Sequence, residues 1–305
     1  MNKCASLIWN TKTIKCSRSL STKGRQTPAE YCLDLVRKRD HESYLCSLLL
    51  PHNIRSAAFA IRAFNVEIAQ IEDQVTDNLI GKMRYKFWED SLDNIYSGLP
   101  PRSPVPLELH RLLKRHKLSK RYFKRLISSR SERSGVTTFA DLESLEKYAE
   151  NAFSSIYYLL LEANSTVNVD ADHAASHLGK SHGIVTLIRS VPYHAQKRNC
   201  ILPQDILMNH DISMESLFRG KSSKALTDVI FEVSSRAKLH LDKAQSLKGA
   251  TQKECASIFL PAIIIEDYLE KLRLADFEIF SPRLHRKNNL LPLQLYWKNL
   301  VRKYK

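Results

Sequence analysis

The stretch HLGKSHGIVTLIRSVPYHAQKRNCILPQDIL, residues 177–207, decides the fold. Its middle, GIVTLI, is strongly apolar, and Pro192 and a Leu-Pro step at residues 202–203 follow it. A second stretch, IRAFNVEIAQIED at residues 61–73, is apolar on nearly all sides when it is drawn as a helix. Helices of this kind are buried in the middle of a large bundle. The two stretches therefore predict an all-α core around which the rest of the chain is arranged.

Helical periodicity continues outward from this core through nearly the whole chain. We expect helices at residues 28–49, 53–73, 77–96, 139–163, 170–190, 223–247 and 252–273, two short ones within 107–130, and short pieces near 205–209, 214–218 and the C-terminus. Pro51 and Pro192 should end helices, and Asp77 should cap one. The helix at 77–96 should direct four apolar side chains to the core: Met83, Phe87, Leu92 and Ile95. Because no strand pattern and no clear domain boundary interrupts the series, we predict a single all-α domain.

The charge of the chain is uneven. The formal net charge is +15, and the first 26 residues hold six Lys or Arg and no acid. A basic, hydroxyl-rich, acid-free start predicts a mitochondrial transit peptide over residues 1–26, with a disordered basic tail as the alternative. Removing these six charges leaves about +9 for residues 27–305. This charge suits contact with anionic lipid, an acidic protein, a diphosphate or nucleic acid.

Cysteine spacing argues against a cysteine-based metal site, and hydropathy argues against a membrane-spanning helix. The six cysteines show no CxxC spacing and no pairing with metal-ligand histidines, so we expect free thiols. No run of apolar residues approaches the roughly 18 that a spanning helix needs.

The order of features within residues 177–207 resembles the squalene/phytoene synthase family. Members of that family place a Gly-x-Ala/Ser step, an apolar helix ending in Arg-Asp, an acidic loop and a Leu-Pro-x-Asp in this order. The corresponding positions here are Gly179–Ser181, Arg189–Ser190, Tyr193–His194 and residues 202–205. The resemblance runs over residues 28–275. It implies a single-domain, isoprenoid-synthase-like helical bundle around a central cavity, in a family that joins two prenyl diphosphates head to head.

The resemblance fails at the acids that family members use to bind Mg²⁺. Members carry two Asp-rich motifs whose carboxylates, at i and i+4 on one helix face, hold the ions that neutralise diphosphate. Other residues stand here: Val66, Glu67 and Gln70 in the first motif, and Ser190, Tyr193 and His194 in the second. Of these only Glu67 is acidic. The resemblance thus implies a pseudoenzyme with both motifs degraded, and with no catalytic residue, metal or cofactor.

Longer blocks give a narrower resemblance. RKRDHESYLCSLLLP, ADHAASHLGKSHGIVT and KNNLLPLQLY are similar to a mitochondrial branch of the same family, whose members assist assembly of respiratory complex I (NADH:ubiquinone oxidoreductase). This resemblance implies a non-catalytic assembly factor that acts early, on the matrix side of the inner membrane and in peripheral contact with it. Its partners would be complex I subunits or assembly intermediates.

Two other functions stay open. A divergent transferase that uses prenyl diphosphates, or a protein that binds an isoprenoid or another lipid, would keep the fold, and turnover would require Glu67. A nucleic-acid-binding protein is suggested by charge alone. Because no nucleic-acid fold motif appears, we expect no nucleic-acid partner.

Several polar residues lie within apolar segments. Arg62 and Arg189 are either remnant phosphate contacts in the cavity or partners in ion pairs, and the ion pair is favoured because a lone buried charge is costly. For Arg62 and Arg189 the candidate partners are Glu67 and Glu72. His173, His177 and His182 share one helix, and the first two are spaced as metal ligands can be. No third ligand is evident, so packing and capping roles are favoured; Tyr193–His194 could contact a ligand or anchor a loop.

Two segments combine apolar and basic residues. The run HRLLKRHKLSKRYFKR, His110–Arg125, could be a solvated helix face, lie on an anionic membrane, or contact a protein or nucleic acid. We rank membrane or protein contact first. The C-terminal tail LLPLQLYWKNLVRKYK places Tyr296 and Trp297 at an apolar-to-basic border, which suits a membrane interface, a partner groove or packing against the helical body.

Overall fold

Helices account for the regular structure of the chain. The computed structural model describes residues 26–75, 77–136, 138–220, 222–247, 253–286 and 288–303. Within those ranges no strand forms, and the β contact present is an isolated bridge between Phe139 and Pro203. The predicted all-α fold is confirmed. The predicted leader, residues 1–26, lies outside the described residues except for Gln26.

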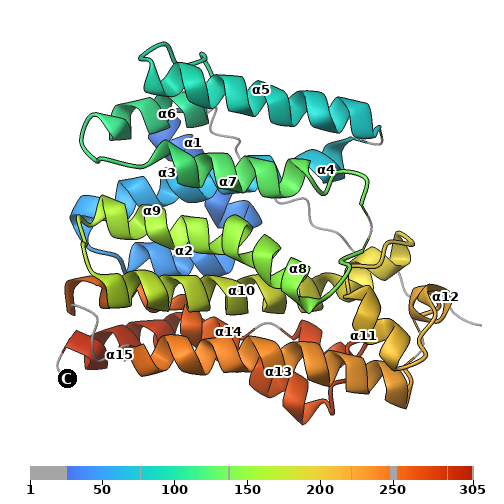
Figure 1. Cartoon of the computed structure of the whole chain (residues 1–305). Helices are drawn as coiled ribbons and strands as arrows, with labels where there is room; N and C mark the ends of the chain where they lie inside the picture. Colours follow the sequence, from blue (N-terminus) through green and yellow to red (C-terminus); the bar gives the residue numbers. More distant parts are fainter. Residues whose placement is uncertain are drawn as a thin grey trace, which may run out of the picture.

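The helices follow one another with short connections (Figure 1). The first half contains α1 (Pro28–Arg39), α2 (His41–Leu48), α3 (His52–Ala69), α4 (Ile71–Gln74), α5 (Asn78–Tyr96), α6 (Pro104–Leu113), α7 (Lys120–Ser131), α8 (Leu142–Ala149), a π-helical segment (Glu150–Ser154) and α9 (Ser155–Ala163). The second half contains α10 (Val169–Gln196), α11 (Gln204–Asn209), α12 (Met214–Phe218), α13 (Lys224–Ser246), a 3-10 helix (Lys253–Phe259), α14 (Pro261–Leu274), a 3-10 turn (Pro282–His285) and α15 (Leu291–Lys303).

The long helix α10 organises the bundle. It contacts α8 and α9 on one side and α13 and α14 on the other, as Figure 1 shows. Farther out, α1 and α6 contact α3, and α5 packs on α6 and α7 at the upper edge of Figure 1. The predicted core stretches of α3 and α10 are both buried, with Ile61, Phe64, Ile184 and Ile188 removed from solvent. This apolar burial is the main favourable term in the folding of the bundle.

Helix α10 approaches the π segment and the end of α8 closely, because Gly179 and Gly183 have no side chain there. A Cβ added at Gly179 would lie 2.1 Å from Ser154 Oγ and 2.4 Å from Ser154 Cα. At Gly183 an added Cβ would lie 2.5 Å from Ala149 Cβ. The Gly-x-Ser step of the sequence is therefore a packing feature, in which missing side chains let two helical backbones touch.

Three predicted helices are each divided. Residues 28–49 form α1 and α2, because Asp40 has the non-helical angles φ −141° and ψ 66° and its side chain accepts the N–H of Ser43 at 3.2 Å. Asp40 is thus an N-cap inside a segment that reads as continuous. Residues 53–73 form α3 and α4, which divide at Gln70. Residues 252–273 likewise form a 3-10 helix followed by α14, which begins at Pro261.

The prediction that Pro192 ends its helix is wrong. Helix α10 continues to Gln196 with Pro192 inside it. Proline removes one backbone hydrogen bond and costs roughly 3 kcal/mol in a helix interior. Val191 precedes Pro192 and Ala195 follows it. Both are buried, so this last turn packs against the core.

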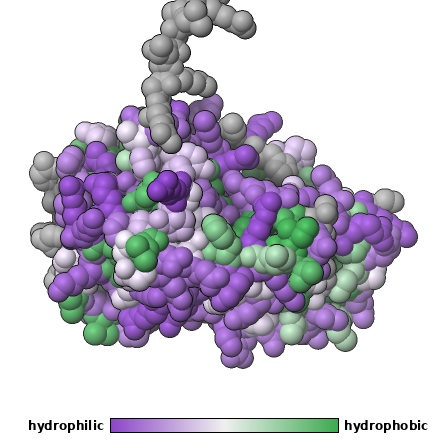
Figure 2. All heavy atoms as spheres, turned by 90° about the horizontal axis from the view of Figure 1, so that it is seen from above, coloured by the Kyte–Doolittle hydropathy of each residue, from purple (hydrophilic) through white to green (hydrophobic). Residues whose placement is uncertain are grey.

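Two of the four side chains of α5 that were predicted to face the core are exposed instead. Asp77 caps the helix as expected, and Leu92 and Ile95 are buried. Met83 and Phe87, however, are 65% and 56% exposed, and the buried positions of this part of the helix are Gly81, Tyr85 and Trp88. Figure 2, which looks onto the α5 side, shows apolar side chains gathered among hydrophilic ones. The spacing of the apolar residues fits two opposite faces, and the sequence does not say which one the core takes.

The described cysteines are free and buried. Cys32, Cys46, Cys200 and Cys255 form no disulfide, which confirms the expected free thiols for these four. Burial raises the pKa of Cys32 and of Cys46 to about 12, so both thiols are protonated and unreactive at neutral pH. Cys4 and Cys16 lie outside the described residues. Of the helices described, none has the length and apolar content needed to cross a membrane.

Candidate functional site

The residues that the sequence resemblance assigns to the first motif lie at the end of α3. Val66 is buried and has no polar side-chain atom, and Gln70 is the residue at which α3 ends. Glu67, the acid that remains, accepts a hydrogen bond from Tyr31 Oη at 3.1 Å. Burial raises the pKa of the Glu67 carboxyl, and the Tyr31 hydrogen bond opposes this shift only in part. The hydrogen bond from Tyr31 therefore connects the Glu67 carboxyl group to α1.

The second motif lies in the last turns of α10. The Ser190 hydroxyl donates to the backbone oxygen of Leu187 at 2.9 Å, within its own helix. His194 is half-buried, and burial lowers the pKa of its imidazole although the charge of Asp73 opposes the shift. Neither side chain offers the anionic oxygen that the corresponding acid would supply.

Side-chain hydrogen bonds to Asp73 connect α4 with the C-terminal end of α10. Tyr193 Oη donates to Asp73 Oδ1 at 2.8 Å, and Lys197 Nζ donates to the same oxygen at 3.0 Å. Partial burial favours the protonated acid, yet the hydrogen bonds from Tyr193 and Lys197 outweigh it and hold the pKa of Asp73 below its usual value. The Lys197 ammonium thus neutralises the charge of Asp73. Tyr193 is an anchor between two helices.

This set of donors does not fit Mg²⁺. The ion binds six oxygen ligands, and its protein ligands are mainly carboxylates. Three carboxylates lie at or near the two motif segments: Glu67, which accepts from Tyr31, Asp73, which is paired with Lys197, and Glu72, whose pKa is raised by burial. The other side chains at the motif positions supply an alkyl group, an amide, a hydroxyl, a phenol and an imidazole. Across the described part of the chain, no three His, Cys, Asp or Glu side chains are grouped so that they could hold a metal ion.

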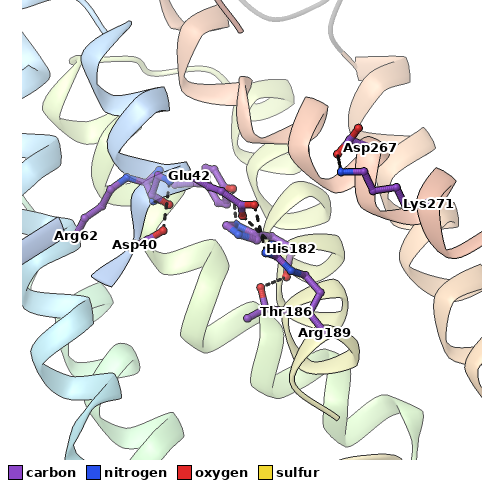
Figure 3. Close-up of polar contacts among 10 residues, drawn as sticks. Asp40, Glu42, Arg62, His182, Thr186, Arg189, Asp267 and Lys271 are labelled. Atoms are coloured by element: carbon purple, nitrogen blue, oxygen red, sulfur yellow. Dashed lines mark hydrogen bonds and ion pairs between the residues drawn. The ribbon is translucent and has the colours of Figure 1, made fainter. Parts of the chain in front are cut away.

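Arg62 lies deep in the bundle without a carboxylate partner. Its side chain is 3% exposed, and Nη1 donates to Ser43 Oγ at 2.7 Å, while Nε has no hydrogen-bond partner in the described residues. The expected pair with Glu67 or Glu72 is wrong: among the described residues Arg62 forms an ion pair with neither, and it donates to Ser43 instead. Figure 3 shows Arg62 beside Asp40, the N-cap of α2, and Glu42 of α2; the sequence did not predict that these residues lie near Arg62.

His182 faces the same interior region. One ring nitrogen, Nδ1, shares a hydrogen bond of 2.8 Å with Tyr157 Oη of α9. Burial, together with the positive charge of Arg62, lowers the pKa of His182 to about 3. The imidazole is therefore neutral at physiological pH, and the two groups form a neutral hydrogen-bonded pair next to a buried guanidinium (Figure 3).

Arg189 forms an ion pair that connects two helices. Its Nη1 and Nη2 donate to the two carboxylate oxygens of Glu42 at 2.7 and 3.2 Å, and its guanidinium lies 5.4 Å from the ring centre of Tyr268. The predicted ion pair is confirmed for Arg189, although its partner is Glu42 of α2. Burial disfavours the charged form of Arg189, but Glu42 outweighs this and raises its pKa.

The three helical histidines do not share a ligand. His177 Nδ1 lies 2.8 Å from His240 Nδ1 of α13, and His240 Nε2 lies 3.3 Å from Glu146 Oε1 of α8. Burial lowers the pKa of both His177 and His240. His182 is paired with Tyr157, and His173 takes part in neither contact. These contacts fit the packing role.

Known proteins resemble the chain along most of its length. A profile of the squalene/phytoene synthase family matches residues 36–289. A Bos taurus protein named NADH dehydrogenase (ubiquinone) complex I, assembly factor 6 is 46% identical over 274 residues, which cover 90% of this chain and 82% of that one. A Homo sapiens protein of the same name is 46% identical over 266 residues, covering 87% and 80%.

A solved structure supports the fold. A dehydrosqualene synthase in complex with ligand aligns with a TM-score of 0.78 at 16% identity, covering 90% of this chain and 95% of that one. Such an identity shows the fold alone, which is the helical fold of isoprenoid synthases. Together with the profile match over residues 36–289 and the two relatives at 46% identity, it establishes that the chain belongs to the squalene/phytoene synthase family.

Proposed function

We propose that this chain is a non-catalytic assembly factor for mitochondrial respiratory complex I. It acts early in assembly, on the matrix side of the inner membrane, and its partners are complex I subunits or assembly intermediates. The observation that carries the proposal is the 46% identity, over 90% of the chain, to a relative named complex I assembly factor 6. Residues 1–26 serve as the transit peptide that brings the chain into the mitochondrion.

The chemistry of the two motif segments supports a pseudoenzyme. Departure of diphosphate develops negative charge that family members neutralise with metal ions. In this chain Val66, Gln70, Ser190 and His194 stand at the metal-binding positions, and the nearby Asp73 is paired with Lys197. We propose that both motifs are degraded and that the chain needs no metal, cofactor or catalytic residue.

Depletion of the protein tests the assembly role. Cells that lack the chain are expected to lose complex I activity and the assembled complex on native gels, while the other respiratory complexes keep their levels. Re-expression of the full chain should restore complex I. Unchanged complex I after complete loss of the protein would refute the proposal.

A purified sample tests the enzymatic alternative. We expect no condensation product when the chain is incubated with farnesyl or geranylgeranyl diphosphate and Mg²⁺. Saturable product formation that disappears in a Glu67→Gln variant would establish a transferase instead. Extraction of the same sample with organic solvent shows whether a lipid or isoprenoid copurifies with the chain.

A further inference from the structure

The outer face of α5 exposes a row of large apolar side chains. The row, here called the α5 stripe, consists of Leu79, Ile80, Met83 and Phe87, all exposed. Their spacing places them on one side of the helix, opposite the buried Tyr85 and Trp88. Single exposed apolar residues are common on soluble proteins, but a contiguous row marks a surface that meets something other than water.

Cations line both edges of the α5 stripe. At 100° per residue, Lys82 and Lys86 follow one edge and Arg84 follows the other. All three side chains are exposed, and Asn78–Phe87 contains no acid. Acids begin two residues after Phe87: Asp90 continues the face of the stripe, and both Glu89 and Asp90 pair with Lys86. An apolar stripe with lysine and arginine on its flanks is typical of helices that lie in the surface of an anionic membrane.

The basic run His110–Arg125 lies beside the C-terminal end of α5, past the stripe. It contains eight Lys or Arg and no acid. Lys120 and Lys124 of α7 lie 2.7 and 3.5 Å from Asp93 of α5, on the same side of that helix as Lys82 and Lys86. The run therefore continues the positive charge of this side of α5 beyond the end of the stripe. A partner that covers this surface must offer both apolar depth and many negative charges.

We propose that the α5 stripe and the basic run together dock the chain onto an anionic lipid bilayer. The four apolar side chains enter the boundary between headgroups and acyl chains, and the lysines and arginines contact lipid phosphates. Helix α5 is the outermost element on its side of the bundle, so a flat surface reaches it (Figure 1). This inference rests on the membrane contact that accompanies the proposed function, and it assigns that contact to particular residues.

The C-terminal helix α15 lies far from the α5 stripe (Figure 1). In α15, Leu291 and Leu295 are buried against the body, whereas Leu293, Tyr296 and Trp297 are exposed. Helix α15 contacts α2 and the 3-10 helix and lies across the molecule from α5 (Figure 1). One flat bilayer that covers α5 therefore leaves α15 free for another contact.

Vesicle sedimentation of the full chain tests the proposal. Phosphatidylcholine vesicles with and without phosphatidylglycerol are mixed with the wild type and with a Met83→Glu/Phe87→Glu variant. The control is Phe231→Glu/Leu239→Glu, which makes the same charge change at equally exposed positions of α13 on the other side of the bundle. Thermal melts check that both variants fold.

We expect the α5 variant to bind anionic vesicles about tenfold more weakly than the control, because each carboxylate replaces an inserting side chain and repels lipid phosphate. A Phe87→Trp chain should also be quenched by brominated lipid more strongly than a Phe231→Trp chain. Equal sedimentation of the two double variants, or equal quenching, overturns the proposal.

Complex I rescue separates this proposal from the proposed function. An α5 variant that binds vesicles normally but fails to restore complex I would show that the stripe docks a protein, which also overturns the lipid proposal. If depletion leaves complex I intact, the proposed function fails, while the vesicle result still decides the role of the stripe.

Discussion

Substitution of Gly179 by alanine tests the close packing of α10 against the π segment. The new Cβ would lie 2.1 Å from Ser154 Oγ and 2.4 and 2.5 Å from the Ser154 Cα and backbone N. Two of these three atoms belong to the backbone, so the contact cannot be relieved by turning a side chain. Overpacking of this kind costs about 1–3 kcal/mol, and backbone contact places it at the upper end. The higher helix propensity of alanine relative to glycine offsets about 1 kcal/mol of this cost.

The net loss in the free energy of unfolding is therefore about 2 kcal/mol, or roughly 4 °C in the melting temperature for a chain of this size. The matched control is Gly81→Ala in α5, where the nearest atoms to a new Cβ are Ser134 Oγ at 3.3 Å and Val75 Cγ2 at 3.4 Å. We expect this variant to be as stable as the wild type or slightly more stable. Urea titrations followed by circular dichroism compare the two. If Gly179→Ala is as stable as Gly81→Ala, the close approach of the helices is incorrect.

Three further experiments test the interior polar contacts. Ser43→Ala removes the acceptor of the buried Arg62 and should cost about 2–3 kcal/mol in urea titrations, whereas adding Arg62→Met should recover most of that loss; no recovery would mean that the guanidinium is solvated. A double-mutant cycle on Glu42 and Arg189 should give a coupling below about 1 kcal/mol because both side chains are partly exposed, and a larger value would contradict this. The pKa of His182 falls from 6.5 to about 3 on folding, so the unfolded chain binds more protons. Its stabilising effect is complete above pH 6.5 and is lost as the pH falls towards 3. Between pH 7 and pH 5 the wild type should lose about 1–2 kcal/mol through this residue, and His182→Gln should lose less; equal losses would be inconsistent with a neutral histidine.

The helical architecture could be predicted from the sequence because periodicity and caps are local signals. Asp77 caps α5 as expected, and the two short helices expected within residues 107–130 correspond to α6 and α7. Asp40 was missed because its capping signal lies inside a continuous apolar pattern. Pro192 misled the prediction because burial of the residues around it outweighs the local cost of proline.

The orientation of α5 could not be predicted from its own residues. Met83 and Phe87 lie on one apolar face, and Tyr85 and Trp88 lie on the other. Which face is buried depends on how α6 and α7 pack against α5, and the residues of α5 alone do not specify this. For the same reason the spacing could not distinguish a core face from a docking surface.

The candidate site was located by resemblance, but its contacts come from the structure. The sequence identified Arg62 and Arg189 as polar residues in apolar helices, and it predicted an ion pair correctly for Arg189. It could not name Glu42, because that residue is 147 positions away from Arg189 in the sequence. The pairing of Asp73 with Lys197 was missed for the same reason, since each lies on a different helix.

Rescue of complex I by a Glu67→Gln chain tests the absence of catalysis most directly. Glu67 is the one acid left within the first motif, and its amide counterpart keeps the size of the side chain and an oxygen that can accept from Tyr31. In cells that lack the protein, we predict that wild-type and Glu67→Gln chains at equal abundance restore complex I to the same level. A wild-type chain that restores complex I beside an equally abundant Glu67→Gln chain that does not would contradict a non-catalytic assembly factor.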